Sequence, residues 1–469
     1  MSLLKHTFLY SVGKILPQFI GFLLLPIYTS VLTTKEYGII ESLYIVTMVL
    51  TIFFSLASER SMFRLYYDYK TKLDKQLFIG NLSIIVIIAS SCLLGLTFLF
   101  SNQVSLIFKD IPFNPFFIFA ILTSFLMTFS FIPQTLYQVE KQPIKFLILS
   151  ISTFVTSTLF ILYFILYQQQ GAIGLIKGRF FGYLCIFPFN LLIIYKASSF
   201  KIKKRVIKNI LNFSIPMIPI LLTAWILNMS NRIFIEQYFS LIEVGIFSLA
   251  FRISSIVTIV LGGLFTAFNP VFYSLSNDNI NIEESKNKLY NLCKIISFTV
   301  LFTCFSVCLV SKEIISLFFD KSYSPAIGLI PLIIVSILLV NISGLFNLMI
   351  YQEKKPKTIM YISIVGAFLS ILLNFLLVPR YGMIGAAYAS IITALIIMVS
   401  KYVYARKAYY IGLPIKSMFF YFVLGLIVIF FDMKFNYNLY YSLVTKCVIL
   451  GLLIIVFYIK NKSLRKLIT

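Results

Sequence analysis

The sequence predicts an all-α polytopic membrane protein with about 14 transmembrane helices, and its composition and its hydropathy pattern both support this. The chain has 469 residues, of which 60% are hydrophobic and only 12% are charged. Soluble domains average about 25% charged residues. A helix needs about 20 apolar residues to cross the hydrocarbon core of a bilayer, and segments of that kind follow one another from end to end. No polar stretch is long enough for a separate soluble domain.

Each predicted span is an apolar segment bounded by polar or turn-forming residues. The first apolar run has no small-residue cleavage site after it, so we interpret it as a span and not as a signal peptide. The expected spans lie near residues 10–31, 38–58, 78–101, 112–137, 145–167, 171–194, 211–235, 244–272, 289–310, 324–350, 357–378, 382–404, 417–431 and 438–459.

Three short motifs occur twice, in the same order, at an offset of about 210 residues, which indicates an internal repeat. The pairs are Glu36-Tyr37-Gly38-Ile39 with Glu243-Val244-Gly245-Ile246, Tyr137 to Lys141 with Tyr351 to Lys355, and Gly171-Ala172-Ile173-Gly174 with Gly382-Met383-Ile384-Gly385. Six spans separate the members of each pair. Because six is even, both halves enter the membrane in the same orientation, which is a parallel repeat typical of transporters.

The repeat predicts four parts of the chain. They are an N-terminal six-helix bundle at 1–195, a basic cytoplasmic linker at 196–210, a C-terminal six-helix bundle at 211–405, and two additional transmembrane helices within 406–469.

The net charge of +24 does not indicate nucleic-acid binding, because the positive charge is distributed by side of the membrane. Lys and Arg are roughly four times as frequent on the side that holds both termini and the central linker, which the positive-inside rule assigns to the cytoplasm. The excess also favours contact with anionic lipid head groups. We therefore expect a bilayer partner, no nucleic acid, and both termini in the cytoplasm.

No feature of the sequence indicates an enzyme or a bound cofactor. The six cysteines lie in or beside apolar segments without a Cys-x-x-Cys pair, and the single histidine is His6. Motifs of nucleophilic, zinc-dependent and nucleotide-dependent enzymes are missing from the sequence. We predict that the protein is not an enzyme and that it has no cofactor.

Charged residues within the spans are the best functional candidates, because a charge at membrane depth must face water or a partner. In the seventh span, Trp225, Asn228, Arg232 and Glu236 follow helical spacing and form one stripe. The other candidates are Arg252 with Ser248 and Ser255, Lys14 with Gln18, Lys177 with Arg179, and Glu41 and Arg60.

Cations outnumber acids in this set, which predicts a cavity for an anionic head group such as a phosphate or pyrophosphate, which arginine can hold with two hydrogen bonds. The predicted substrate-binding residues are Arg252, Arg232, Lys14, Arg179, Lys177, Arg60, Gln18 and Asn228, and the predicted ion-coupling residues are Glu41 and Glu236. The alternative for Lys14, Lys177, Glu41 and Arg252 is that the side chain extends to the nearest interface. For Arg60 the alternative is a cytoplasmic anchor.

Two segments resemble the polysaccharide flippases of the O-antigen and capsule type (Wzx type), which belong to the multidrug/oligosaccharidyl-lipid/polysaccharide exporter superfamily. They are Asn231 to Ile235 with Ile242 to Ile253, and Ser11 to Gly38. The chain has Asn231-Arg232 where the family often has Asp-Arg. If that acid takes part in ion coupling, this protein couples elsewhere.

The resemblance implies a MATE-like fold in the bacterial inner membrane and a function as a flippase. The substrate would be an undecaprenyl-pyrophosphate-linked oligosaccharide, carried by alternating access with a proton or sodium gradient. We expect a monomeric transport unit that works with other polysaccharide-assembly proteins. The alternatives are a multidrug/ion antiporter of the same superfamily, and a membrane polysaccharide polymerase or ligase.

The topology can be tested with reporter fusions at Gln169, which we expect outside the cytoplasm, and at Lys203, which we expect inside it. The two fusions should give opposite signals. Equal signals would show that the number of spans between them is wrong.

Overall fold

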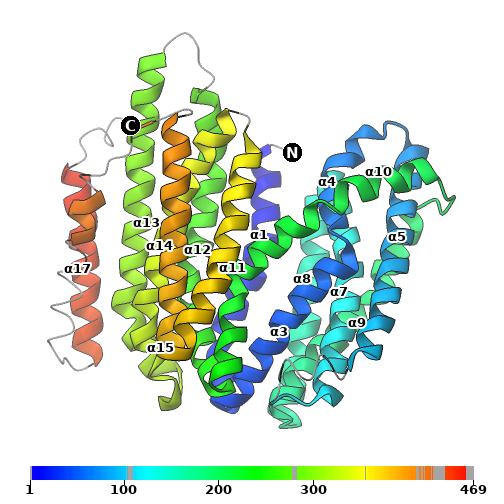
Figure 1. The fold of residues 1–469 in the computed structure, drawn as a ribbon, viewed down its shortest axis with the longest axis horizontal. Coiled ribbons are helices and arrows are strands. Elements are labelled where there is room, and N and C mark those ends of the chain that lie inside the picture. Colours follow the sequence, from blue (N-terminus) through cyan, green and yellow to red (C-terminus); the bar gives the residue numbers. More distant parts are fainter. Residues whose placement is uncertain are drawn as a thin grey trace. The chain divides into compact units, whose positions relative to one another are not determined.

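The protein is helical in every part that its structure, a computed structural model, describes. The described residues are 3–101, 103, 108, 110–276, 282–353, 355–407, 411–412, 416, 418–423, 425 and 439–460, and no strand occurs among them. The predicted all-α fold class is confirmed (Figure 1).

The chain forms two compact units, Met1–Gly245 and Ile246–Thr469. These two units are defined by how the chain packs and not by the sequence repeat. The predicted boundary between the repeats, at the linker 196–210, therefore remains a prediction. The first unit holds α1 (Leu3–Leu23), α2 (Leu25–Val31), α3 (Thr34–Ser55), α4 (Ser58–Leu65), η1 (Tyr66–Asp68), α5 (Lys72–Leu99), η2 (Phe113–Phe117), α7 (Ile118–Val139), α8 (Pro143–Leu162), η3 (Tyr163–Tyr167), α9 (Gly171–Ala197), α10 (Lys204–Ser214), α11 (Met217–Tyr238) and the first turn of α12 (Leu241–Ser276).

The second unit holds the remainder of α12 and the helices that follow it. These are α13 (Ile282–Phe318), η4 (Lys321–Tyr323), α14 (Ala326–Gln352), α15 (Pro356–Lys407) and α17 (Leu439–Lys460).

Among the described residues, 11 helices are long and apolar enough to cross a membrane. The longest, α15, has 52 residues and a kink at Gly382, where φ is 55°. A straight helix of that length would measure about 78 Å, against a hydrocarbon core of about 30 Å, so α15 supplies the two spans predicted at 357–378 and 382–404. The span predicted at 438–459 corresponds to α17. The span predicted at 417–431 lies largely outside the described residues, so the count of 14 remains a prediction.

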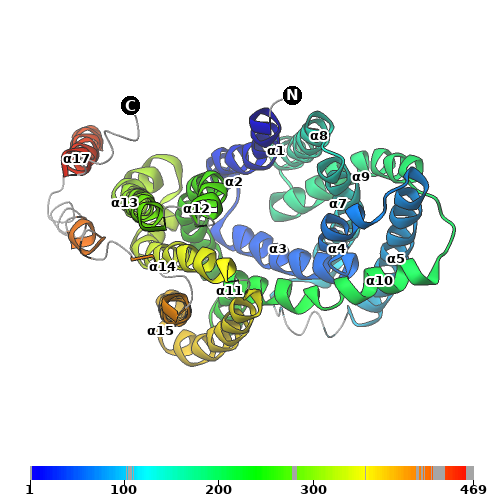
Figure 2. The same cartoon turned by 90° about the horizontal axis from the view of Figure 1, so that it is seen from above.

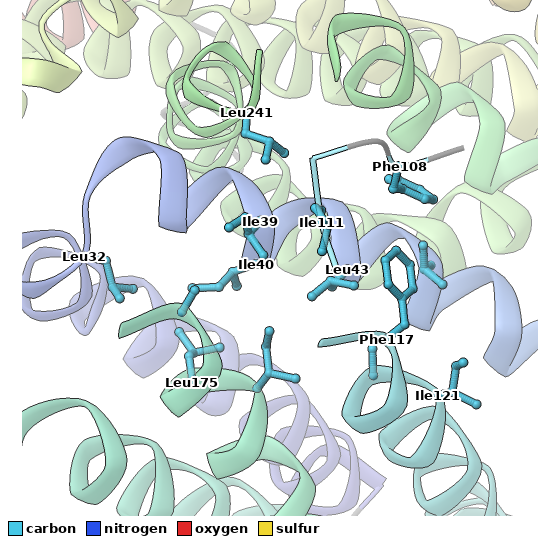
Figure 3. Packing of buried hydrophobic residues seen from close by; sticks show 14 of the residues in the cluster. Leu32, Ile39, Ile40, Leu43, Phe108, Ile111, Phe117, Ile121, Leu175 and Leu241 are labelled. Atoms are coloured by element: carbon cyan, nitrogen blue, oxygen red, sulfur yellow. The ribbon is translucent and has the colours of Figure 1, made fainter. Parts of the chain in front are cut away.

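Helix α3 is the central helix of the first unit. Its apolar window is 61% buried, whereas that of Val12–Val31 is 17% buried. Its side chains Ile39, Ile40 and Leu43 form a hydrophobic cluster with residues of other elements, among them Phe117, Ile121, Leu175 and Leu241 (Figure 3). Most of the surface of α3 is therefore in contact with other parts of the protein, and so are most of its polar residues.

A short helix closes one end of the first unit. Helix α10 packs across the ends of α4 and α5 (Figure 2). It is amphipathic, because Val206, Ile210 and Ser214 are buried while Lys204 and Lys208 are exposed. Its apolar residues join a second cluster that contains Met62 and Phe78.

The repeated Glu-x-Gly and Gly-x-x-Gly motifs meet in the first unit. The Thr33 hydroxyl accepts a hydrogen bond from the backbone N–H of Glu36, and the Glu36 carboxylate accepts one from the backbone N–H of Thr33 at 2.9 Å, which completes a capping box. The other oxygen of Glu36 accepts a hydrogen bond from the backbone N–H of Ala172 at 3.2 Å. One carboxylate thus joins the starts of α3 and α9.

Gly38 and its repeat counterpart Gly245 mark a close backbone approach. A Cβ on Gly38 would collide with the carbonyl oxygen of Leu241, and a Cβ on Gly245 would collide with the carbonyl oxygen of Thr34. Thr34 and Leu241 are themselves counterparts at the repeat offset, so the contact is reciprocal. A reciprocal contact is expected where two copies of one motif pack about a pseudo-two-fold axis.

In the second unit, a buried ion pair attaches α17 to α13. The Lys446 ammonium lies 2.7 Å from Glu313 Oε1, and the two side chains are 1% and 3% exposed. Lys446 also donates to the carbonyl of Leu309, and the Ser442 hydroxyl donates to Glu313 Oε1, both at 2.7 Å. A charge pair held away from water needs such extra hydrogen bonds to offset its desolvation.

The substitution Gly38→Ala should destabilise the protein. Overpacking at a closed contact costs about 1–3 kcal/mol, although alanine favours a helix over glycine by about 1 kcal/mol. The matched control is Gly21→Ala in α1, where an added Cβ meets nothing within 4 Å. In thermal unfolding of the detergent-solubilised protein, Gly38→Ala should lower Tm and Gly21→Ala should not. Equal Tm values for the two variants would contradict the close approach.

Candidate functional site

Four polar side chains of α3 and α11 meet inside the first unit. They are Glu41 and Ser42 on α3 and Arg232 and Glu236 on α11, and we name them the α3–α11 seam. All four are buried, with exposed fractions between 0% and 8%. Three of the four are residues that the sequence singles out for substrate binding or ion coupling.

The seam contains one ion pair and one hydrogen-bonded carboxylate. Arg232 Nε lies 4.0 Å from Glu41 Oε2, and Arg232 Nη1 donates to the carbonyl oxygen of Asn228 at 3.2 Å. The Ser42 hydroxyl donates to Glu236 Oε2 at 2.5 Å. The other oxygen of Glu236, Oε1, is buried without a hydrogen-bond partner among the described residues.

Local sequence explains how these side chains meet. Arg232 and Glu236 are four residues apart, so they lie one above the other on a single face of α11. Farther along that helix the Trp225 indole donates to the carbonyl oxygen of Ile45 at 3.2 Å. This bond holds α11 against α3, next to the turn of α3 that carries Glu41 and Ser42.

The seam combines groups suited to ion coupling. A buried charge is tolerated when it is paired and hydrogen-bonded. Arg232 is paired with Glu41 and donates a hydrogen bond to the carbonyl oxygen of Asn228. Glu236 has a free carboxylate oxygen in a buried position, where it can take up a proton or contact a small cation. Protonation of either carboxylate would change the charge of the seam and the interaction between α3 and α11.

Two further predicted cations border α3 and the start of α7. The Arg179 guanidinium on α9 lies over the ring of Tyr44, 5.5 Å from its centre. The Lys177 ammonium donates to Gln170 Oε1 at 3.1 Å and lies 5.9 Å from the centre of the Phe119 ring. Both cations are half-buried.

The other predicted residues lie elsewhere. Four of them are exposed, namely Lys14 and Gln18 on α1, Arg60 on α4 and Asn228 on α11. Arg252 lies on α12 in the second unit and is half-buried, with the Ser255 hydroxyl donating to its carbonyl oxygen at 2.7 Å. The structure thus brings together Glu41, Arg232 and Glu236, and the cavity predicted from the full set remains a prediction.

Sequence reasoning missed Ser42. Its hydroxyl is the hydrogen-bond partner of Glu236, although the two residues are 194 positions apart. The available signal was its position beside Glu41, since a small polar residue next to an acid in an apolar span suggests a partner on a facing helix.

The ion pair can be tested with a double-mutant cycle on Glu41→Gln and Arg232→Gln. Each single change takes the partner away from a buried charge and should cost about 3–5 kcal/mol. The double change should cost less than the sum, with a coupling of about 0.5–3 kcal/mol. Stability of the solubilised variants is the measurement.

The matched control is the pair Arg64–Asp68 in the same unit, which is close at 2.9 Å but 62% and 52% exposed. An exposed pair contributes about 0–1 kcal/mol, so Arg64→Gln and Asp68→Asn should show little coupling. Additive effects at Glu41 and Arg232 would mean that the two charges do not stabilise each other.

Two known proteins are similar to this chain in sequence. The chain is 23% identical over 279 residues to Lsg locus putative protein 1 of Haemophilus influenzae, and the match covers 58% of this chain and 66% of that protein, just under two thirds. It is 27% identical over 295 residues to the capsular polysaccharide biosynthesis protein CapF of Staphylococcus aureus, covering 59% and 71% of the two chains.

Among solved structures, the fold matches the lipid II flippase MurJ in an inward closed conformation with a TM-score of 0.78, at 16% identity, over 98% of this chain and 100% of that chain. It also matches a multidrug resistance MATE family transporter in an inward-facing conformation with a TM-score of 0.65, at 13% identity, over 87% and 94%. The predicted MATE-like fold is therefore confirmed. The family model described as polysaccharide biosynthesis protein matches residues 27–328, and the chain belongs to this family, as its resemblance to the polysaccharide flippases led us to expect.

Proposed function

We propose that the protein is a flippase for undecaprenyl-pyrophosphate-linked oligosaccharide repeat units. Its family is one of polysaccharide biosynthesis, and its two curated relatives belong to a capsular polysaccharide system and to the Lsg locus. A fold that matches a lipid II flippase over 98% of the chain suits a substrate made of a lipid, a pyrophosphate and sugars. The membrane would be the bacterial cytoplasmic membrane, with both termini in the cytoplasm.

The observation that carries the proposal is the buried α3–α11 seam. In a membrane helix bundle, ionisable residues that are retained away from water mark transport pathways and proton relays. The seam places an arginine and two carboxylates together. Helix α9, which packs against α3, carries the cations Lys177 and Arg179. Guanidinium groups are suited to a pyrophosphate because they form paired, charge-assisted hydrogen bonds with it.

The mechanism that we propose is alternating access. The pyrophosphate and the sugars would cross within the protein along its cations, with Arg252, Arg232 and Arg179 as the principal contacts. The lipid tail would stay in the bilayer, because moving it into water would lose about 0.8 kcal/mol for each CH₂ group. Glu41 and Glu236 would couple transport to a proton or sodium gradient, since binding a cation at either carboxylate changes the charge that faces Arg232.

A second candidate is a multidrug/ion antiporter, which the fold of the MATE transporters favours. Cationic drugs would need an acidic or apolar cavity, whereas four of the predicted substrate contacts are Arg252, Arg232, Arg179 and Lys177. The two candidates differ in the substrate that they transport. A transport assay of the reconstituted protein, with a lipid-linked oligosaccharide or with a cationic dye, distinguishes them.

Arg252→Ala should abolish surface glycan in a bacterium that depends on this protein, because it removes a charge that we expect to meet the pyrophosphate. Arg252→Lys should keep part of the activity, since it keeps the charge and loses the paired hydrogen bonds. Lipid-linked repeat units should accumulate on the cytoplasmic leaflet. The measurements are surface glycan, the accumulated lipid-linked intermediate, and the amount of protein in the membrane.

The matched control is Arg380→Ala, which removes an exposed arginine of α15 between the two spans predicted at 357–378 and 382–404 and should leave export unchanged. Normal export by Arg252→Ala at wild-type protein levels would make Arg252 structural. If the protein transports a cationic dye and does not flip the lipid-linked oligosaccharide, the result would contradict the flippase and support the antiporter.

A further inference from the structure

A pocket of about 580 Å³ lies at the end of the first unit, between the segment after α4 and helix α10. Its lining residues are Leu65, Asp68, Tyr69, Lys203, Arg205, Val206, Asn209, Asn212 and Phe213. Ligand pockets commonly measure about 300–1,000 Å³, so it can hold a group the size of a phospholipid head group. None of these residues takes part in the α3–α11 seam.

The rim of the pocket is cationic. Lys203 and Arg205 line it with one acid, Asp68. The Asp68 carboxylate is already engaged by the Arg64 guanidinium at 2.9 Å, so the net charge around the pocket is positive. Phosphate is the common anion that pairs with both lysine and arginine.

The remaining lining supplies neutral donors and an apolar floor. Asn209, Asn212 and the Tyr69 hydroxyl can donate hydrogen bonds, and burial raises the pKa of Tyr69, which keeps its proton in place. Leu65, Val206 and Phe213 are apolar. Exposed cations beside buried or half-buried apolar side chains match a molecule whose phosphate is attached to a hydrocarbon part, and they suit a free phosphate less well.

The walls of the pocket are held in place. Asn81 on α5 donates to the carbonyl oxygen of Lys201 at 3.0 Å and accepts from the backbone N–H of Lys203 at 2.9 Å. The backbone N–H of Ser199 donates to the carbonyl oxygen of Gln76 at 2.8 Å. These bonds attach the linker to α5, so the rim is formed before a ligand arrives.

Exposed apolar side chains beside α10 indicate where the ligand comes from. Phe200, Ile202 and Ile215 are 43%, 67% and 53% exposed on the flanks of this basic helix. A basic amphipathic helix with exposed apolar neighbours lies in the interface of a bilayer. The positive-inside rule assigns this linker to the cytoplasmic leaflet, whose anionic lipids attract Lys and Arg.

We propose that this pocket binds the phosphate head group of an anionic membrane phospholipid. The bound lipid would hold α10, the helix that leads into α11, against α4 and α5. The proposal is independent of which substrate the protein transports.

The experiment uses the purified full-length protein and measures retained lipid by native mass spectrometry. The probes are phosphatidylglycerol, phosphatidylcholine and inorganic phosphate, each supplied alone. The wild type should retain phosphatidylglycerol in preference to phosphatidylcholine. Each Lys or Arg near an anionic surface contributes about fivefold in affinity, so Lys203→Gln/Arg205→Gln should weaken phosphatidylglycerol retention about 25-fold.

The matched control is Lys355→Gln/Lys357→Gln, which removes two exposed positive charges from another loop predicted in the cytoplasm and should leave retention unchanged. Asp68→Asn should increase retention, which provides a test in the opposite direction if the first variant folds poorly. Equal losses in the pocket and control variants would overturn the proposal, as would equal retention of the two lipids. Binding of inorganic phosphate without a preference for phosphatidylglycerol would overturn the lipid as its source.

Discussion

A charged side chain in the hydrocarbon core of a membrane requires a partner within the protein, and the pair formed by Glu41 and Arg232 satisfies this requirement where α3 meets α11. The two groups are 4.0 Å apart and almost fully buried, so each provides the opposite charge that the other needs away from water. Glu236 and Ser42 extend the same contact by one hydrogen bond. A contact built from charge and hydrogen bonds can change with ion binding, whereas the apolar contacts around it cannot. The proposed coupling therefore depends on this seam.

The repeated motifs have structural functions that explain why both halves contain them. Glu36 caps α3 and also accepts a hydrogen bond from Ala172 at the start of α9, so in the first half the first and third motifs are two sides of one contact. Ser240 and Glu243 form the corresponding cap before α12, with the Glu243 carboxylate accepting from the Ser240 backbone N–H at 2.8 Å. Gly38 and Gly245 are needed where a carbonyl oxygen of the other copy comes too close for a Cβ. In both copies of the first motif, the glutamate therefore caps a helix and the glycine allows a close backbone approach.

The spans were predictable because a membrane helix must be apolar over a fixed length, and this requirement is visible residue by residue. The first 12 predicted spans correspond to described helices, with α15 supplying two of them around the kink at Gly382. The candidate site was predictable only in part. The stripe of Arg232 and Glu236 follows from helical spacing within α11, but the choice of Glu41 and Ser42 as partners depends on how α3 packs against it. Facing residues on different helices have no fixed spacing in sequence. For the same reason the sequence did not identify Glu313 as the partner of Lys446.

The central claim is that the carboxylates of the α3–α11 seam couple transport to an ion gradient. The most direct measurement is the rate at which the reconstituted protein flips a lipid-linked oligosaccharide, with and without an imposed proton or sodium gradient. In the wild type the rate should increase with one of the two gradients. In Glu236→Gln, which should retain the hydrogen bond from Ser42 but cannot ionise, the rate without a gradient should persist while its increase is lost. An unchanged response to the gradient in both Glu236→Gln and Glu41→Gln would contradict the account.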